Sequence, residues 1–334
     1  MTHLRRFGPG LLVAAALATV ATLLGTVLPI VGGPVLALFG GVAVGVVGRR
    51  FVADTGPLGP GLTLTKQRFL AAAIVLLGLG MPVGSVLTVG RDTAVVLIGT
   101  LVAGAVAAVV VGRLLALDRE SATLVAVGTT ICGASAIAAA TAVLKPDRHR
   151  VAYALATIFV FNVVAVLVYP PLGRLLGLSQ EAFGLWAGTA INDTSSVLAA
   201  GVVFGPAAAH FAVIVKLVRS LMIVPLCVGL HLAKRRSAPD HAANTPLRQV
   251  FPLFVVLFLG ASLIAGLGIL PDSLTAPLAR LSGWLIAAVL AAIGTGLTWQ
   301  QLRTAGARPL LFGGILAVVL GTSSLALQLA TGWW

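Results

Sequence analysis

The sequence predicts an all-α polytopic membrane protein, and three observations support this fold class. Hydrophobic residues make up 59% of the 334 residues and charged residues only 9%, with a mean hydropathy of +1.08. A soluble domain carries about a quarter charged residues, so this chain could not cover a water-facing surface. The apolar residues form long runs, and the Lys and Arg residues stand in short loops between them.

A membrane-crossing helix needs roughly 20 apolar residues, and we divide the chain by that length. The expected segments are 8–31, 34–48, 67–90, 92–114, 120–144, 149–173, 182–204, 207–232, 248–270, 282–302 and 309–331. This predicts about 9–11 transmembrane segments in a single transporter domain, residues 1–334, with a motif-bearing core at 120–232. The longest polar stretch, 233–249, is expected to be a cytoplasmic loop.

The net charge of +13 follows the positive-inside pattern of a bacterial inner-membrane protein and does not call for a nucleic-acid partner. Arg5 and Arg6 place the N-terminus on the cytoplasmic side, and the first apolar run is interpreted as a retained helix. The two cysteines stand in apolar segments without metal-ligand spacing, so no disulfide framework, metal or cofactor is expected. A nucleotide-binding GxxxxGK[ST] motif is absent, and we expect no enzyme activity.

Segment 120–144 leaves two topologies open. If it spans the membrane, the basic loop 145–150 lies outside, against the positive-inside rule. If it is a re-entrant hairpin, that loop stays inside and segment 182–204 dips in from the other face. The hairpin interpretation is favoured, because the two segments would then form an inverted repeat as in transporters. The spanning interpretation gives two interrupted helices that run in the same direction.

These two segments carry a near-duplicated motif: residues 128–140 read GTTICGASAIAAA, and residues 188–200 read GTAINDTSSVLAA. A helix is interrupted at membrane depth only where the freed backbone groups face protein or a polar cavity. In the first motif Gly133 frees the backbone, and hydroxyls come from Thr129, Thr130 and Ser135. The alternative is that the small residues only allow close helix packing.

The second motif has polar residues where the first has glycine: Asn192, Asp193, Thr194, Ser195 and Ser196. Such residues favour caps and turns, so Asp193 or Thr194 is expected to cap a half-helix that begins near Ser195. A carboxylate within the membrane indicates function by default. Two half-helix N-termini that point at one site would suit an anion.

Two cations, Lys216 and Arg219, interrupt a later apolar run and share one helix face because they are three residues apart. They are expected either to pair with Asp193 or to neutralise a transported anion, and both can hold. Asn162 could face the same cavity or serve in packing. His210 and Cys132 are interpreted as structural.

The motifs at 128–139, 184–201 and 212–226 resemble, in this order, the signature regions of the sulfate exporter family of bacterial membrane proteins. That family is grouped at a distance with bile-acid symporters and arsenite exporters. The resemblance implies a multi-pass carrier with inverted repeats and two interrupted helices at its centre. Family members can hold His at the position of Asn192, so a His-dependent proton step is not implied for this chain.

We therefore expect a secondary transporter that exports a small anion such as sulfate or an organosulfur anion, with proton or sodium coupling, as a monomer or homodimer in the lipid bilayer. The expected substrate-binding residues are Thr129, Thr130, Gly133, Ser135, Thr189, Asn192, Asp193, Thr194, Ser195, Ser196, Lys216 and Arg219. The alternative is a sodium-coupled organic-anion carrier of the bile-acid symporter type. A passive channel or an intramembrane enzyme is less well supported.

Overall fold

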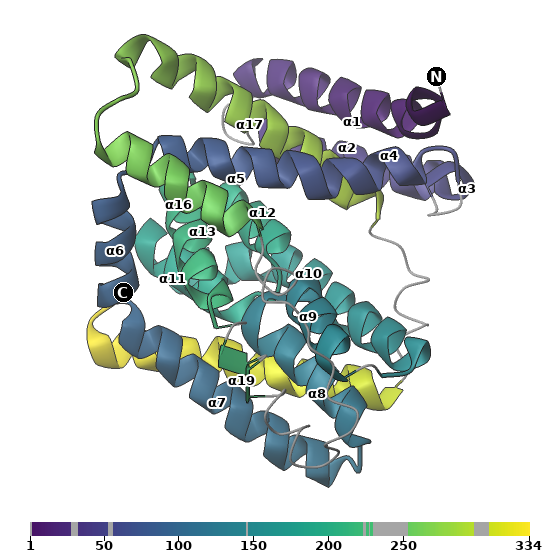
Figure 1. Cartoon of the computed structure of the whole chain (residues 1–334), viewed down its shortest axis with the longest axis vertical. Coiled ribbons are helices and arrows are strands. Elements are labelled where there is room, and N and C mark those ends of the chain that lie inside the picture. The colour runs from purple at the N-terminus through teal and green to yellow at the C-terminus, as the bar shows by residue number, and fades with distance from the viewer. Residues whose placement is uncertain are drawn as a thin grey trace. The chain divides into compact units, whose positions relative to one another are not determined.

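The structure is a computed structural model that describes residues 2–27, 33–52, 56–144, 146–222, 225–226, 228–229, 253–296 and 307–334. Within these ranges all regular secondary structure is helical, as Figure 1 shows. Six of the described helices are long and apolar enough to cross a membrane: Arg6–Thr26, Gly59–Leu79, Ala94–Leu114, His149–Leu175, Ser273–Thr295 and Ala307–Thr331. The predicted all-α polytopic membrane fold is confirmed. The predicted loop 233–249 lies outside the described residues.

The chain divides into two compact units. The first comprises Met1–Leu87 and Leu253–Trp299, and the second comprises Thr88–Pro252 and Gln300–Trp334. The motif-bearing core predicted at 120–232 falls within the second unit. The single transporter domain expected from the sequence stays a prediction.

The first unit is a bundle of helices packed through small residues. Its helices are α1 (Thr2–Val27), α2 (Gly33–Val47), α3 (Arg49–Val52), α4 (Gly59–Leu64), η1 (Thr65–Phe69), α5 (Leu70–Leu79), α16 (Leu253–Gly266) and α17 (Asp272–Thr295). A Cβ atom on Gly41 of α2 would lie 2.1 Å from the Ala291 carbonyl oxygen of α17. Glycine thus lets these two backbones approach closely, as is common between membrane helices.

The bounds predicted for segment 67–90 are wrong at both ends. The helix begins at Gly59 and ends at Leu79, and the separate helix α6 (Val83–Asp92) follows. Lys66 lies inside the helix, in the π-helical turn η1, and does not flank it. The chain breaks before Pro82 because proline lacks an N–H donor and disfavours helical geometry in the residue that precedes it.

The second unit contains two helical hairpins beside long helices. Its long helices are α7 (Ala94–Leu114), α10 (Arg148–Leu175), α13 (Pro206–Ser220) and α19 (Ala307–Thr331). We define hairpin 1 as α8 (Arg119–Val127), η2 (Gly128–Cys132) and α9 (Ala134–Leu144), and hairpin 2 as α11 (Gln180–Ala190) and α12 (Thr194–Phe204).

Hydrogen bonds at the two bases show that each hairpin returns to the level at which it started. At the base of hairpin 1, Arg150 contacts Asp118 and Glu120 at the start of α8, although it follows α9 in the chain. At the base of hairpin 2, the Gln180 side chain accepts hydrogen bonds from the backbone N–H groups of Ala207 and Ala208, at 2.9 and 3.2 Å. Both predicted segments are therefore re-entrant.

Helix α10 shows that the hairpins enter from opposite sides. It has 28 residues and is about 42 Å long at ~1.5 Å per residue, enough to cross a bilayer. Its first turn holds Arg150, which contacts the base of hairpin 1. Its last turn holds Arg174, which donates a hydrogen bond of 2.6 Å to the Val203 carbonyl at the base of hairpin 2. The favoured inverted arrangement of the two motifs is confirmed.

Candidate binding site at the hairpin tips

The two hairpins meet at their tips. Hairpin 1 breaks at Gly133, whose backbone angles are φ +70° and ψ −131°, and hairpin 2 breaks between Ala190 and Thr194. A Cβ atom on Gly133 would lie 2.8 Å from the Cβ atom of Asp193. These two residues occupy the same place in the two aligned motifs, so equivalent positions of the repeat are in contact.

Asp193 caps helix α12 with its own carboxylate. One oxygen accepts from the N–H groups of Ser195 (2.7 Å) and Ser196 (3.0 Å) and from the Ser195 hydroxyl, and the other accepts from the Ser196 hydroxyl at 2.7 Å. The predicted N-cap is thus confirmed, with α12 beginning at Thr194. Because this carboxylate already occupies the helix N-terminus, α12 has no free N-terminal site for a second anion.

The N-terminus of α9 at the tip of hairpin 1 is different. Ala134 and Ser135 begin this helix and are exposed, and the Ser135 hydroxyl has no hydrogen-bond partner among the described residues. The first N–H groups of a helix have no partner within the helix and carry its partial positive charge. The tip of hairpin 1 therefore offers hydrogen-bond donors that the tip of hairpin 2 does not.

Three of the four predicted threonines direct their hydroxyl protons into their own helices. Thr129 donates to the Val125 carbonyl at 2.8 Å, Thr130 to Ala126 at 2.7 Å, and Thr189 to Leu185 at 2.7 Å. All three are buried, as is Thr194. Among the described residues, the hydroxyls of Ser135 and Thr194 have no hydrogen-bond partner, since the Ser195 and Ser196 hydroxyls donate to Asp193. Ser135 is exposed, whereas Thr194 is buried.

Lys216 and Arg219 on α13 connect the two tips. Both side chains are fully buried, at 0% and 1% exposure. Lys216 Nζ donates to the Ile191 carbonyl at 2.7 Å, where α11 ends, and Arg219 Nε donates to the Thr130 carbonyl at 2.6 Å, in the last turn of hairpin 1 before its break. One helix thus supplies one cation to each hairpin.

The expected ion pair between these cations and Asp193 is wrong. Among the described residues, the ion pairs within 4.0 Å all involve Arg150. The physical reason is the helix break itself: the last carbonyls of a helix have no partner within it and carry partial negative charge, so they attract cations.

Several buried polar atoms near these elements have no partner in the described part of the chain. They are Arg219 Nη1 and Nη2, Asn192 Oδ1 at the tip of hairpin 2, and Asn162 Oδ1 on α10. Cys132 is buried beside the first break, and His210 is exposed on the first turns of α13. Unpaired buried groups of this kind are rare in proteins and mark places where a ligand could bind.

A buried polar connection joins hairpin 2 to α19 and was not predicted from the sequence. Thr189 and Ser324 share a hydrogen bond of 2.6 Å, and Trp186 Nε1 donates to the Gly321 carbonyl at 3.0 Å. Tyr169 stacks on Trp186 with ring centroids 4.3 Å apart. The spacing of Ser324 and Gln328, one helical turn apart in an apolar run, was the available signal.

We expect the substitution Trp186→Phe to lower the free energy of unfolding by about 0.5–1.5 kcal/mol, because it removes the indole N–H that donates to the Gly321 carbonyl. Thermal unfolding of the purified protein in detergent measures this effect. Trp284→Phe is the matched control, since that indole N–H bonds the exposed Thr19 hydroxyl at 3.1 Å. Equal losses in the two variants would contradict the assigned role of Trp186.

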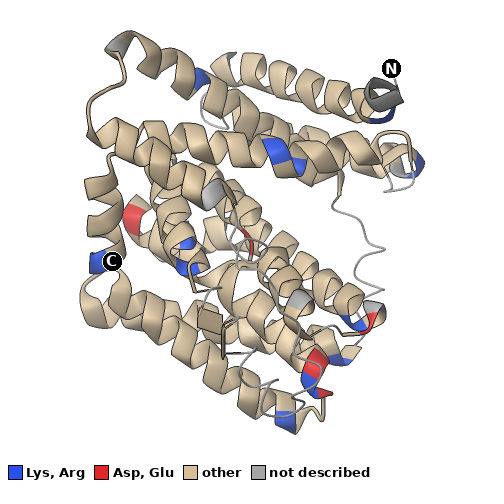
Figure 2. Cartoon of the chain, in the orientation of Figure 1, with Lys and Arg blue, Asp and Glu red and all other residues tan. Residues whose placement is uncertain are grey.

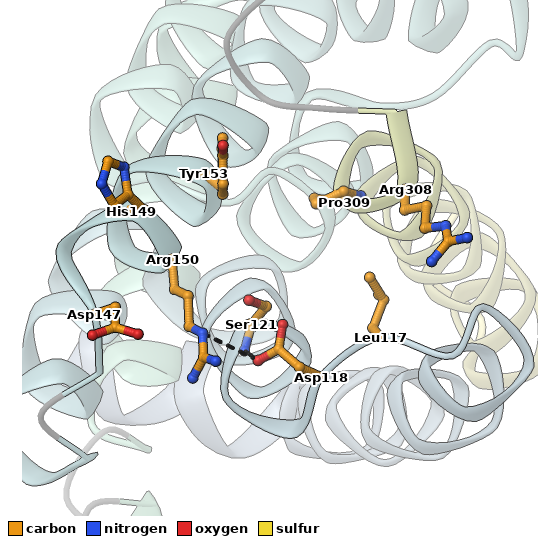
Figure 3. A pocket seen from close by; sticks show the side chains of 9 residues that line it. All are labelled: Leu117, Asp118, Ser121, Asp147, His149, Arg150, Tyr153, Arg308 and Pro309. Carbon is orange, nitrogen blue, oxygen red and sulfur yellow. Dashed lines mark hydrogen bonds and ion pairs between the residues drawn. The ribbon is translucent and has the colours of Figure 1, made fainter.

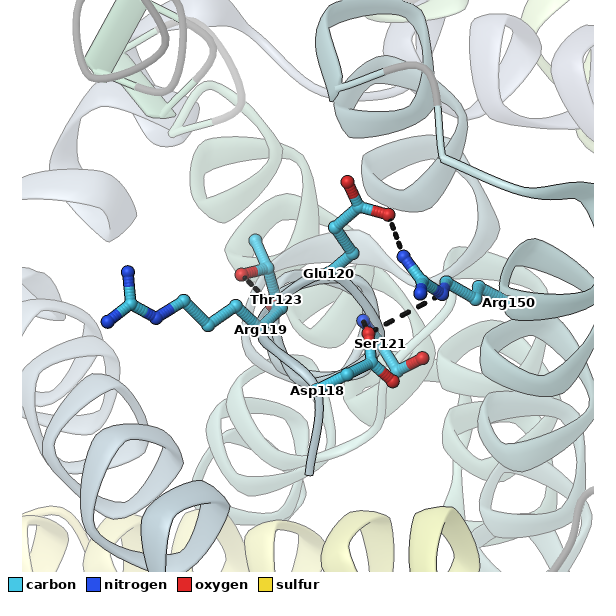
Figure 4. A network of polar contacts seen from close by, with 6 residues as sticks. All are labelled: Asp118, Arg119, Glu120, Ser121, Thr123 and Arg150. Carbon is cyan, nitrogen blue, oxygen red and sulfur yellow. Dashed lines mark hydrogen bonds and ion pairs between the residues drawn. The ribbon is translucent and has the colours of Figure 1, made fainter. Parts of the chain in front are cut away.

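A pocket of about 660 Å³ lies at the base of hairpin 1, away from the tips (Figure 3). Its lining residues are Leu117, Asp118, Ser121, Asp147, His149, Arg150, Tyr153, Arg308 and Pro309. Figure 4 shows Arg150 reaching across to Asp118 and Glu120, and Figure 2 shows red and blue side by side at the start of α8. This charged cluster fixes the base of the hairpin at the start of α10.

The pKa of Asp118 lies below its ordinary value of 3.8. Partial burial raises the pKa, but the hydrogen bonds from Ser121 and the charge of Arg150 together outweigh it. A carboxyl whose folded pKa is lowered adds stability above its unfolded pKa, and this stability is lost as the pH falls through the folded value. We expect Asp118→Asn to lower the unfolding temperature at pH 7. Below about pH 4, the unfolding temperature of the variant should fall less than that of the wild type, because the variant has no carboxyl group to protonate at this position. A pH series of thermal unfolding measures both, and parallel curves for the two proteins would contradict the prediction.

The long apolar helices and the opposed re-entrant hairpins define a polytopic, all-α membrane protein. The chain belongs to the UPF0324 membrane protein family, and the family model described as Conserved hypothetical protein 698 matches residues 9–313. The resemblance to the sulfate exporter grouping is consistent with this family.

Its relatives match over nearly their whole length. UPF0324 membrane protein SpyM3_0740 of Streptococcus pyogenes is 39% identical over 345 residues, covering 100% of this chain and 99% of that protein. UPF0324 membrane protein spr0034 of Streptococcus pneumoniae is 36% identical, and a UPF0324 membrane protein of Clostridium tetani is 31% identical, each covering 99% of both chains. No solved structure matches the chain significantly.

Proposed function

We propose that this protein is a secondary transporter that exports a small anion, such as sulfate or an organosulfur anion, by alternating access. One observation carries the proposal: two opposed re-entrant hairpins meet at Gly133 and Asp193, where α13 contributes two buried cations. In known transporters, substrate and coupling-ion sites lie at the interface of inverted repeats, at interrupted helices.

The charges at the tips favour an anion. Lys216 and Arg219 are basic and Asp193 is acidic, so the tips hold one more basic side chain than acidic ones. An uncompensated charge is costly in the low dielectric of a membrane interior, and a bound anion offsets this cost. The N–H groups of Ala134 and Ser135 at the start of α9, which have no partner among the described residues, and the Ser135 hydroxyl provide neutral donors beside it.

In the proposed mechanism the anion binds at the two tips, among the residues predicted from the motifs, with Ser135 and the start of α9 as its neutral donors. Asp193 keeps α12 capped and holds the second tip against Gly133. Because the hairpins enter from opposite ends of α10, movement of one bundle past the other could open the site to each side in turn. The same proposal includes coupling to a proton or another ion, an inner-membrane location with a cytoplasmic N-terminus, and a homodimer.

A sodium-coupled organic-anion carrier is the second candidate. The buried Asn192 Oδ1, which has no partner in the described part of the chain, favours it, because amide and carboxylate oxygens can bind a hard cation and Asn192 neighbours Asp193. In this case the Na⁺ would neutralise Asp193, and the cations on α13 would hold the substrate carboxylate.

Counterflow in proteoliposomes tests these proposals. Vesicles loaded with unlabelled sulfate, sulfite or methanesulfonate are expected to accumulate labelled sulfate with the wild-type protein, with and without sodium. Accumulation that requires sodium and prefers a carboxylate would favour the second candidate. Flux that dissipates gradients without counterflow would identify a channel and would contradict both carrier proposals.

A further inference from the structure

The Arg219 side chain is fully buried but only partly hydrogen-bonded. Its Nε donates to the Thr130 carbonyl at 2.6 Å, whereas Nη1 and Nη2 have no partner among the described residues. Each of these nitrogens carries two N–H donors, so up to four charged donors face no acceptor in the described chain. The exposed fraction of the residue is 1%, which also leaves no water-facing route for them.

Lys216, one turn earlier on the same helix, is in a different situation. Its Nζ has an acceptor, the Ile191 carbonyl at 2.7 Å, and its position is fixed by the end of α11. The Ser220 hydroxyl donates to the Lys216 carbonyl at 2.8 Å, so the backbone of Lys216 is also bonded to the next turn of α13. Lys216 thus holds the end of α11 and keeps two further N–H donors, whereas both terminal nitrogens of Arg219 have no partner among the described residues.

No carboxylate neutralises the Arg219 fork in the described part of the chain. Asp193, the acid at the tips, has both oxygens engaged by Ser195 and Ser196. Leaving a buried charged donor unpaired costs more than leaving a neutral one unpaired, so a bound acceptor would stabilise the protein.

We propose that the Nη pair of Arg219 is the specificity-determining ligand for the transported anion, and that it selects an oxyanion that can present two oxygens. A planar guanidinium forms two parallel hydrogen bonds to such a group, whereas an ammonium acts as a point charge and a halide ion has a single acceptor centre. Lys216 is then a positioning residue. This inference rests on the proposed anion transport.

The same side chain ties ligand binding to hairpin 1. Arg219 Nε holds the last turn before the Gly133 break while the Nη atoms face the ligand. Because Arg219 is fully buried in this structure, an anion reaches the Nη atoms only when α13 or hairpin 1 moves. Binding and movement of the hairpin are therefore coupled through one guanidinium group.

The substitution Arg219→Lys keeps the positive charge and removes the fork. We expect it to weaken sulfate binding about 10- to 100-fold, because one or two charge-assisted hydrogen bonds are lost. Chloride binding should change less than ~3-fold. Thermal stabilisation of the detergent-purified protein by sulfate and chloride titrations measures both affinities. Arg174→Lys is the matched control, because Arg174 also donates to a backbone carbonyl but lies at the exposed base of hairpin 2.

Two results of the binding measurements would overturn the inference. If Arg219→Lys binds sulfate within ~3-fold of the wild-type affinity and Lys216→Gln loses sulfate affinity instead, Lys216 is the ligand. Equal stabilisation of the wild type by sulfate and chloride at matched ionic strength would exclude oxyanion selection, and this measurement needs no variant to fold.

Counterflow separates this inference from the proposed function. If sulfate binding depends on Arg219 but the wild type shows no counterflow, the proposed transport function is wrong and the ligand assignment stands. If Arg219→Lys shows normal sulfate counterflow, the proposed transport function stands and the ligand assignment is wrong.

Discussion

Replacement of Gly133 by alanine is expected to destabilise the protein by more than ~3 kcal/mol and to abolish transport. Two costs combine at this residue. A φ of +70° with ψ −131° is a conformation that only glycine adopts readily, at about 1–3 kcal/mol for other residues. The added Cβ would also lie 2.8 Å from the Asp193 Cβ, so the two tips would have to separate.

Gly177→Ala is the control for a positive φ without a close contact. Gly177 has a similar φ of +67°, but a Cβ there would meet nothing within 4 Å. We expect that variant to lose about 1 kcal/mol and to keep its counterflow activity. Thermal unfolding in detergent and counterflow in proteoliposomes are measured for both. Similar losses of stability and activity in the two variants would show that the contact between the tips is not needed.

Asp193→Ala is expected to cost about 2–3 kcal/mol of stability, because four hydrogen bonds to the carboxylate are lost at the start of α12. Asp193→Asn keeps one acceptor oxygen and should recover part of this loss. Transport should fall in both variants, since the tip of hairpin 2 loses its fixed position and the site loses its negative charge.

Asp118→Ala provides the matched control for this cap. Asp118 caps α8, another start of a hairpin helix, but accepts one N–H hydrogen bond of 2.9 Å, from Ser121, and its side chain is 49% exposed. The expected cost is about 1 kcal/mol or less, with counterflow retained. An Asp193→Ala variant that unfolds like Asp118→Ala and transports normally would remove Asp193 from the site.

Local sequence signals predicted the breaks well. Gly133 was expected to interrupt the first motif, and Asp193 was one of two residues expected to cap the half-helix that follows the second break; both are found there. These features depend on residues adjacent in the chain, because a cap bonds N–H groups two or three positions away and a positive φ requires glycine at that position. The end of segment 67–90 was missed although Pro82 was a local signal.

Contacts between distant segments could not be predicted in the same way. The expected partner of Lys216 and Arg219 was the acidic Asp193, but the structure pairs them with the carbonyls of Ile191 and Thr130. Every residue has a carbonyl, so sequence does not distinguish the one that a helix break leaves unpaired. The bond between Thr189 and Ser324 was missed for the same reason, since it joins residues 135 positions apart.

That the chain is a helical membrane protein, and where two of its helices break, followed from the sequence, because hydropathy, glycine and capping residues act over a few neighbouring positions. The packing of the helices was needed to show that both broken segments are hairpins, that they enter from opposite ends of α10 and that their tips are in contact. The charge rule had favoured this topology without excluding two spanning helices. The decision lies in contacts of Arg150, Arg174 and Gly133 with residues far away in the chain, and such contacts form only when the helices pack.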